Sequence, residues 1–255
     1  MNKSLRIVFL GTPDFAVASL KAIIEAGWNV VGVITAPDKK AGRGRKIQQS
    51  AVKAFAESKQ LKLLQPTNLK DADFQADLKA LAADIQIVVA FRMLPESVWN
   101  MPPLGTFNLH ASLLPNYRGA APINWAIING ENKTGVTTFF LKHEIDTGDV
   151  LLQEEVEISE RETAGSLHDK LMHVGSELVV KSLNKIQTGN YKLKSQNNIE
   201  VSSVNEAPKI FKEDCLINWE NKSETIDRLI RGLSPYPAAW TKIIHEESQE
   251  SSSFK

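Results

Sequence analysis

The stretch "LRIVFLGTPDFAVASLKAIIEAGWNVVGVIT", Leu5 to Thr35, decides the fold class. Residues 5–10 are mostly apolar, as in a buried strand, and Gly11-Thr12-Pro13 ends this run. Apolar residues then recur at helical spacing as far as Gly27, and a second apolar run occupies 30–35. A strand, a helix and a strand joined by short turns form a βαβ unit. This unit predicts a parallel sheet with a right-handed crossover.

The same alternation continues to about residue 190. The apolar periodicity predicts strands over 85–91, 105–110, 136–141 and 150–158, and helices over 48–58, 71–83, 119–130 and 163–188. The first of these strands is almost wholly apolar, which is typical of a central parallel strand, whereas the last alternates and is expected near an edge. The sequence therefore predicts an α/β, Rossmann-like domain with a mostly parallel sheet.

The pattern changes after residue 190. Residues 191–207 are polar and are interpreted as a linker. Beyond it, "CLINW" (215–219) and "PYPAAWTKI" (235–243) suggest strands, and Ser223 can cap a helix. We expect a catalytic domain over 1–190, the linker over 191–207, and a partial, β-rich, OB-like C-terminal domain over 208–255. The tail from His245 lacks a core-forming pattern and is expected to be disordered.

The composition is that of an ordinary soluble protein, with 42% hydrophobic and 24% charged residues and a net charge of zero. This balance argues against a wholesale binder of polyanions, although not against a local basic patch. The single cysteine, Cys215, excludes an internal disulfide, favours a reducing compartment and is interpreted as a packing residue. No apolar run approaches the about 20 residues of a membrane helix. We expect a cytoplasmic monomer that does not bind membranes.

Asn108 and His110 are the first candidates for chemistry. Residues two apart in a strand project from the same face, and ligands of open α/β sheets bind beyond the carboxyl ends of the strands. An amide beside an imidazole suits the stabilisation of an oxyanion and the transfer of a proton. The alternative is a core histidine bonded to backbone and an asparagine that caps a turn.

Asp146 lies in "KHEIDTGDV" (142–150), which also holds Glu144 and Asp149. A solvated acidic turn is the simpler interpretation, and we prefer it for Glu144 and Asp149. A carboxylate at 146 that reached His110 would orient the imidazole ring and could accept a proton through water. The five histidines show no metal-ligand spacing, so no metal is expected.

Two glycine-containing turns bear on the choice of ligand. The basic loop "DKKAGRGRK" (38–46) is either a flexible solvated loop or a contact for phosphates, since glycines allow close approach and arginines fork onto phosphate oxygens. The first βα turn has one glycine, and Pro13 and Asp14 occupy positions where a dinucleotide needs amide donors and no negative charge. This turn argues against a nicotinamide oxidoreductase.

Three motifs in this order resemble the folate-dependent formyltransferase family: Asn108-x-His110, "SLLPNYRGAAP" (112–122) and "IDTGDV" (145–150). Three further stretches are similar to the branch of that family that formylates methionyl-tRNA. They are "FLGTPDFA" (9–16), "AGRGRK" (41–46) and "APKIFKEDCLINW" (207–219), the last of which resembles the start of an OB-like C-terminal domain. The similarity extends from Leu5 to about Ile243.

The resemblance implies transfer of a formyl group from the co-substrate 10-formyltetrahydrofolate to the α-amino group of methionyl initiator tRNA. It implies a catalytic trio of Asn108, His110 and Asp146. It also implies that the folate site is lined by Ser112, Leu113, Leu114 and Pro115. The side chains that would approach the acceptor end of the tRNA are Lys40, Arg43, Arg45 and Lys46.

The chain departs from the family pattern at two places. Arg92, in "AFRMLP" (90–95), replaces a small residue beside the expected pteridine pocket, and the C-terminal segment is about half as long as the family's domain. Two other acceptors stay open. Glycinamide ribonucleotide has a phosphate that must bind near the first turn, where Pro13 and Asp14 are unfavourable. A sugar nucleotide would leave the basic loop without an explanation. A non-catalytic protein that binds tRNA or folate is the alternative from another class.

Overall fold

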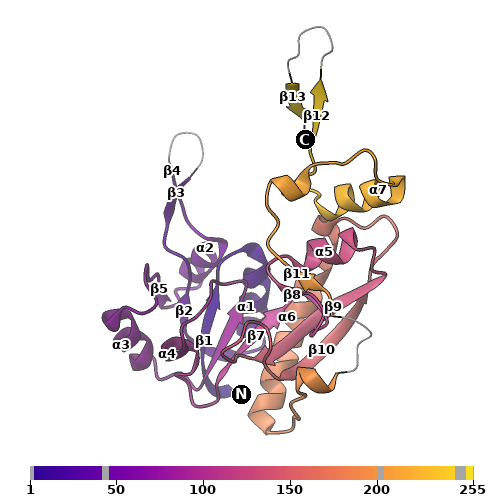
Figure 1. Cartoon of the computed structure of the whole chain (residues 1–255). Coiled ribbons are helices and arrows are strands. Elements are labelled where there is room, and N and C mark those ends of the chain that lie inside the picture. Colours follow the sequence, from indigo (N-terminus) through magenta and orange to yellow (C-terminus); the bar gives the residue numbers. More distant parts are fainter. Residues whose placement is uncertain (1–2, 42–45, 200–203, 245–250, 255) are drawn as a thin grey trace.

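The computed structural model describes residues 3–41, 46–199, 204–244 and 251–254. A seven-stranded sheet forms its centre (Figure 1), with strand order β10-β9-β7-β6-β1-β2-β5. The strands are β1 (Lys3–Gly11), β2 (Trp28–Ile34), β5 (Leu63–Leu64), β6 (Ile85–Val89), β7 (Thr106–His110), β9 (Lys133–Phe140) and β10 (Val150–Glu157). The first five pair in parallel, and β9 and β10 add antiparallel at one edge. The predicted mostly parallel α/β sheet is confirmed.

Burial explains the positions of these strands. All five residues of β6 are buried, which matches its almost wholly apolar sequence and its place at the centre of the sheet. In β10, three consecutive residues from Gln153 to Glu155 are exposed, and the strand lies at the edge as its alternating sequence predicted.

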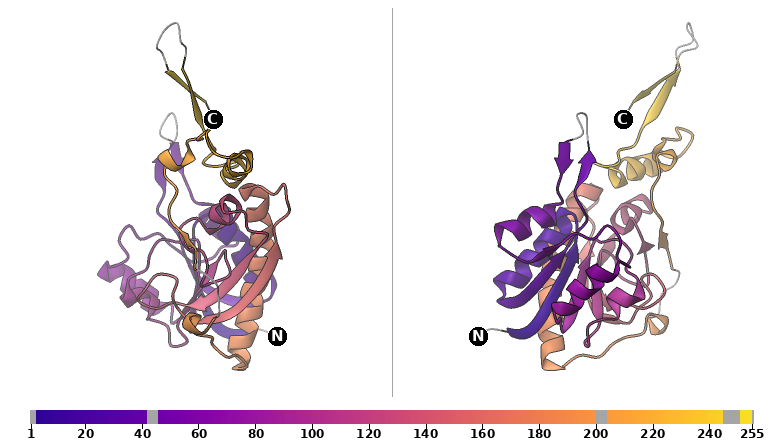
Figure 2. Two further views of the ribbon diagram at one scale, coloured as in Figure 1. Left: turned by 45° about the vertical axis from the view of Figure 1, so that its right-hand side comes forward. Right: turned by 90° about the vertical axis from the view of Figure 1, so that its left-hand side faces the viewer.

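Helices cover both faces of the sheet (Figures 1 and 2). The helices α1 (Asp14–Glu25), α2 (Ala51–Ser58) and α6 (Ala164–Thr188) share the larger hydrophobic core with one face. The short helices α3 (Ala72–Ala80) and α4 (Glu96–Trp99) pack in a second core on the other face. The sequence defines α6 clearly because Thr163 and Ser166 form a capping box at its start and Gly189, with φ 65°, ends it.

The basic loop belongs to a hairpin of β3 (Lys39–Ala41) and β4 (Lys46–Gln48), which pair antiparallel. Asp38, directly before β3, anchors the start of this hairpin. Its carboxylate lies 2.6 Å from Lys53 Nζ and accepts a hydrogen bond of 2.9 Å from Gln65 Nε2. Arg43 and Arg45 lie outside the described residues, and for Lys40 and Lys46 only the backbone is described. The predicted role of these four side chains therefore stays a prediction.

The C-terminal segment differs from the expected one in its elements. The expected strand at "CLINW" is instead a 3-10 turn, Glu213–Cys215, followed by one isolated bridge between Leu216 and Trp240. The turn forms because the Asp214 carboxylate accepts a hydrogen bond of 2.8 Å from the Phe211 amide. Cys215 is buried, as expected of a packing residue.

Beyond this turn, α7 (Ser223–Gly232) packs on α5 (Pro122–Ile128), and Asn124 donates a hydrogen bond of 2.7 Å to the carbonyl of Gly232. The strand expected over 235–243 is shorter, β12 (Thr241–Ile244). It pairs antiparallel with β13 (Ser251–Phe254), where a disordered tail was expected. Residues 245–250 and 255 lie outside the description. The hairpins β3–β4 and β12–β13 extend from the same end of the molecule (Figure 2).

The segment expected as a linker, 191–207, lies against the α/β domain along its described residues. Lys194 bridges to Val150, and a 3-10 turn (Gln196–Asn198) follows. Further on, β11 (Glu206–Ala207) pairs in parallel with β8 (Arg118–Gly119). Backbone pairing of this kind does not depend on hydropathy, so the sequence pattern could not reveal it. Within the described residues, no helix is both long and apolar enough to cross a bilayer.

Candidate active site

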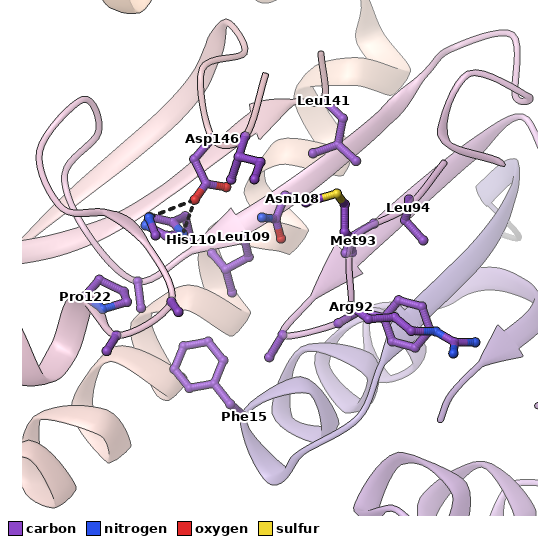
Figure 3. Close-up of a pocket in the computed structure, with 18 of the residues that line it drawn as sticks. Phe15, Arg92, Met93, Leu94, Asn108, Leu109, His110, Pro122, Leu141 and Asp146 are labelled. Atoms are coloured by element: carbon purple, nitrogen blue, oxygen red, sulfur yellow. Dashed lines mark hydrogen bonds and ion pairs between the residues drawn. The ribbon is translucent and has the colours of Figure 1, made fainter. Parts of the chain in front are cut away.

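A cavity of about 720 Å³ opens at the carboxyl ends of the central parallel strands β1, β6 and β7 (Figure 3). Pro13 and Phe15 line it after β1, residues 90–94 after β6, and residues 119–124 after β7. The loop between β9 and β10 closes another side with residues 141–146. The cavity therefore occupies the position where open α/β sheets bind their ligands.

Asn108 and His110 both line this cavity from β7, as their spacing predicted. The side-chain oxygen of Asn108 is buried and has no hydrogen-bond partner among the described residues. Buried polar atoms are normally paired, because an unpaired one costs free energy. The Asn108 oxygen could therefore accept a hydrogen bond from a ligand in the cavity.

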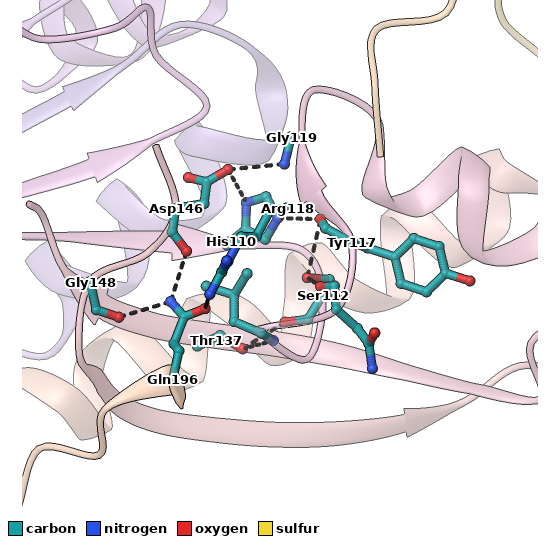
Figure 4. Close-up of polar contacts among 11 residues, drawn as sticks. His110, Ser112, Tyr117, Arg118, Gly119, Thr137, Asp146, Gly148 and Gln196 are labelled. Carbon is teal, nitrogen blue, oxygen red and sulfur yellow. Dashed lines mark hydrogen bonds and ion pairs between the residues drawn. The ribbon is translucent and has the colours of Figure 1, made fainter. Parts of the chain in front are cut away.

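His110 is held from two sides (Figure 4). Its Nε2 atom lies 2.8 Å from the carbonyl oxygen of Tyr117, and its Nδ1 atom lies 3.9 Å from Oδ2 of Asp146. A carbonyl oxygen only accepts hydrogen bonds, so Nε2 carries the proton of this contact. Nδ1, the other ring nitrogen, faces the carboxylate of Asp146.

Asp146 is brought to the histidine by the turn between β9 and β10. Its Oδ2 accepts a hydrogen bond of 3.0 Å from the Gly119 amide, and its backbone has φ 55°. Gly148 allows the turn to approach β9, because a Cβ atom there would overlap the carbonyl of Phe140. Asp149 instead pairs with Lys142 at 2.9 Å. The structure thus brings Asn108, His110 and Asp146 to one cavity, and their catalytic roles stay a proposal.

The "SLLP" turn, from Ser112 to Pro115, lies behind His110 and is not among the residues that line the cavity. The hydroxyl of Ser112 donates a hydrogen bond of 2.6 Å to the Asn116 carbonyl, and the amide of Leu114 donates to Thr137 Oγ1 at 3.1 Å. Ser112 and Leu114 are fully buried. In this structure the turn supports the histidine loop, and a folate contact by its four residues stays a prediction.

Arg92 lies at the rim of the cavity, and its guanidinium points away from His110 (Figure 3). It donates to the carbonyl of Thr67 at 3.0 Å and to that of Pro66. The charged group is therefore bound to a neighbouring loop and leaves the centre of the cavity open.

Sequence reasoning missed two residues behind the site, Tyr117 and Gln196. Tyr117 is buried, its hydroxyl donates to Glu131 Oε1 at 2.5 Å, and its backbone has φ 59°. Burial, together with the Glu131 carboxylate, raises the pKa of Tyr117 to about 12. A tyrosine in a Pro-rich loop and a glutamine in a polar stretch carry no pattern that marks them in the sequence.

The chain matches known family models along most of its length. The model described as "Formyl transferase" matches residues 5–183, and the one described as "Formyl transferase, C-terminal domain" matches residues 209–250. The proteins named methionyl-tRNA formyltransferase include that of Bacteroides fragilis, which is 57% identical over 97% of this chain and 77% of its own length. That of Flavobacterium johnsoniae is 60% identical over 93% of this chain and 75% of its own.

Solved structures share the fold at much lower identity. A sugar N-formyltransferase from a Shewanella species superposes with a TM-score of 0.72 at 17% identity, over 98% of this chain and 96% of its own. HypX from Aquifex aeolicus in complex with tetrahydrofolic acid gives a TM-score of 0.68 at 20% identity, over 94% of this chain and 36% of its own. The family models and the highly identical relatives lead to one conclusion: the chain belongs to the formyl transferase family, in the branch of the methionyl-tRNA formyltransferases.

Proposed function

We propose that this chain transfers a formyl group from 10-formyltetrahydrofolate to the α-amino group of methionyl initiator tRNA, in the cavity at the end of β7. The observation that carries the proposal is that three groups meet there: the Asn108 amide, whose oxygen has no partner among the described residues, the His110 imidazole and the Asp146 carboxylate. The relatives' name gives the acceptor class, and the similar fold solved with tetrahydrofolic acid supports a folate as the donor.

The reaction begins when the neutral α-amine attacks the formyl carbon. An α-amino group has a pKa of about 7.7–8.0, so a substantial neutral fraction exists near neutral pH. The enzyme therefore needs to position the amine more than to deprotonate it. The walls of the cavity, from Phe15 on one side to Leu94 on the other, would hold the two reactants against β7.

Attack on the carbonyl places negative charge on the formyl oxygen. The Nδ2 group of Asn108 would donate a hydrogen bond to this oxyanion, an effect worth about 10²–10³ in rate for one such donor, and the charge of a protonated His110 would stabilise it further. The new bond joins the amine nitrogen to the formyl carbon, and the bond from that carbon to N10 of the folate breaks. The proton that the amine loses passes by way of His110 and Asp146 to the leaving nitrogen.

The 3.9 Å separation between His110 and Asp146 exceeds a direct hydrogen bond. A water molecule between them, or a small closure on binding substrate, would complete the proton path. We also infer that the protein acts as a monomer. We place it in the cytoplasm with the initiator tRNA.

The experiment that tests the proposal compares acceptors. The chain is incubated with 10-formyltetrahydrofolate and with methionyl initiator tRNA, methionyl elongator tRNA or an amino-sugar nucleotide, and formylated product is measured. We expect turnover with the methionyl initiator tRNA. Formylation of the sugar nucleotide alone would instead assign the chain to a different acceptor.

A further inference from the structure

The segment that leaves the α/β domain touches both loops that carry the candidate site. We call this segment the strap and define it as residues 195–199 and 204–208. One loop holds Asp146, and the other runs from Tyr117 to Gly119 beside His110. Along its described residues, the strap lines no part of the cavity itself.

Gln196 is the central contact of the strap (Figure 4). Its side-chain nitrogen donates to the carbonyls of Asp146, at 2.7 Å, and Gly148, at 2.8 Å. Its side-chain oxygen accepts two hydrogen bonds from the Arg118 guanidinium, at 3.0 and 2.6 Å. Carbonyls only accept and a guanidinium only donates, so a single orientation of the amide satisfies all four bonds.

This arrangement is buried and specific. The exposed fraction of Gln196 is 3%, and a buried amide needs all its hydrogen bonds to offset the loss of water. It links the Asp146 turn directly to the strand that provides the Gly119 amide for the Asp146 carboxylate. The two loops are therefore fixed to each other through one side chain.

The other end of the strap fixes Tyr117. The Tyr117 amide donates to the Asn205 carbonyl at 2.6 Å, and Asn205 Nδ2 donates to the Tyr117 hydroxyl at 3.3 Å. Next to it, Gly119 has φ 123°, and a Cβ atom there would overlap the carbonyl of Ala207. The strap thus lies against the backbone that holds His110 Nε2.

We propose that Gln196 is a positioning residue for formyl transfer, which keeps the Asp146 carboxylate beside Nδ1 of His110. The inference rests on the proposed function. Asp146 has a left-handed backbone, a conformation that costs a non-glycine residue free energy unless its surroundings hold it. Gln196 binds the carbonyl of that same residue. Without it, the turn relaxes and the carboxylate moves away from the imidazole.

The first test replaces Gln196 by methionine, which keeps the length of the side chain and removes its four hydrogen bonds. We expect kcat to fall about 10- to 100-fold with the KM values little changed, since misplacing a catalytic group by about 1 Å can cost about 10²-fold. The matched control is Asn197→Ser at the adjacent exposed amide, which should keep the parent's kcat. If Gln196→Met does not fold, Gln196→Glu keeps the length and the Arg118 contact, loses the two donated bonds, and should show the same loss.

A double-mutant cycle separates positioning from a structural role. In an Asp146→Asn background, Gln196→Met should have almost no further effect on kcat, because Gln196 acts through Asp146. The ¹⁵N resonances of His110 give a readout without turnover, and they should change in Gln196→Met but not in Asn197→Ser. A variant with the parent's kcat and an unchanged His110 spectrum would overturn the inference, as would an equal loss in the Asp146→Asn background. Absence of turnover in the parent chain would instead count against the proposed function.

Discussion

Nε2 of His110 lies 2.8 Å from the carbonyl oxygen of Tyr117, seven residues further along the same chain. The loop that follows β7 thereby folds back onto the histidine at the end of that strand. This contact fixes the tautomer of the ring and directs Nδ1 toward Asp146. The chemistry proposed for the cavity depends on this orientation, and each part of the arrangement can be tested separately.

The Asn108 amide is predicted to act on the transition state. Replacement of Asn108 by leucine should lower kcat by about 10²–10³ and change KM little, because the amide would meet the charge that develops only during the reaction. Steady-state kinetics with methionyl-tRNA measures both constants. The matched control is Asn190→Leu at an exposed position beyond α6. An increase in KM at constant kcat would show that Asn108 serves only in binding.

Tyr117 is predicted to stabilise the loop through its hydroxyl. Replacement by phenylalanine removes the hydrogen bonds to Glu131, Asn129 and Asn205 and should lower the free energy of unfolding by about 1–2 kcal/mol. The carbonyl that holds His110 is kept, so kcat should stay near the parent's value. Tyr236→Phe, at a residue that is 81% exposed, is the control.

The raised pKa of Tyr117 also predicts a dependence of stability on pH. The pKa is about 12 in the folded chain, against 10.0 for a free tyrosine. The folded state then keeps its proton where the unfolded state has lost it, so the free energy of unfolding falls as pH rises between these values. Denaturant titrations should show that this part of the decline is missing in Tyr117→Phe. Identical pH profiles for the parent and the variant would contradict the assignment.

Glu162 is predicted to depend on Lys170 for its charge. Burial opposes ionisation, but the hydrogen bond from Lys170 and the one from the Ser159 amide together lower the pKa of Glu162. Lys170→Met should cost about 1–3 kcal/mol at neutral pH, because it leaves a buried carboxylate without its partner. The stabilisation is present above the ordinary carboxyl pKa and is lost as pH falls through the lowered value. Lys181→Met, at an exposed pair, should cost at most about 0.5 kcal/mol.

Arg92 is predicted to support its loop and to leave the pocket unchanged. Its guanidinium binds the carbonyls of Pro66 and Thr67 and does not point into the cavity. Arg92→Ala should therefore lower stability by about 0.5–1.5 kcal/mol and leave the KM for 10-formyltetrahydrofolate near the parent's value. A large rise in that KM would show that the side chain turns toward the co-substrate.

The sequence allowed the α/β sheet to be predicted because local patterns specify it. Residues 85–91 are apolar except for Gln86, and the central strand β6 forms within them at Ile85–Val89. The spacing of Asn108 and His110 placed both side chains on the cavity. Both inferences rest on the spacing of residues within one strand, because this spacing alone determines which face of the strand a side chain projects from.

The contacts that complete the site join residues far apart in the sequence. Gln196 binds Asp146 across a separation of 50 residues, and Asn205 binds Tyr117 across 88. No periodicity marks a single amide in a polar stretch, so this stretch reads as a linker. The error at "CLINW" has a local cause: the Asp214 carboxylate accepts a hydrogen bond from the Phe211 amide, and a turn forms where a strand was expected to begin.

The most direct test of the central claim is the kcat for formyl transfer from 10-formyltetrahydrofolate to methionyl initiator tRNA in the parent chain and in His110→Ala. His173→Ala, at an exposed histidine of α6 that does not line the cavity, is the control. The account predicts that His110→Ala loses about 10²–10⁴ in kcat while His173→Ala stays near the parent. Equal activity of His110→Ala and the parent would contradict the placement of the reaction at the end of β7.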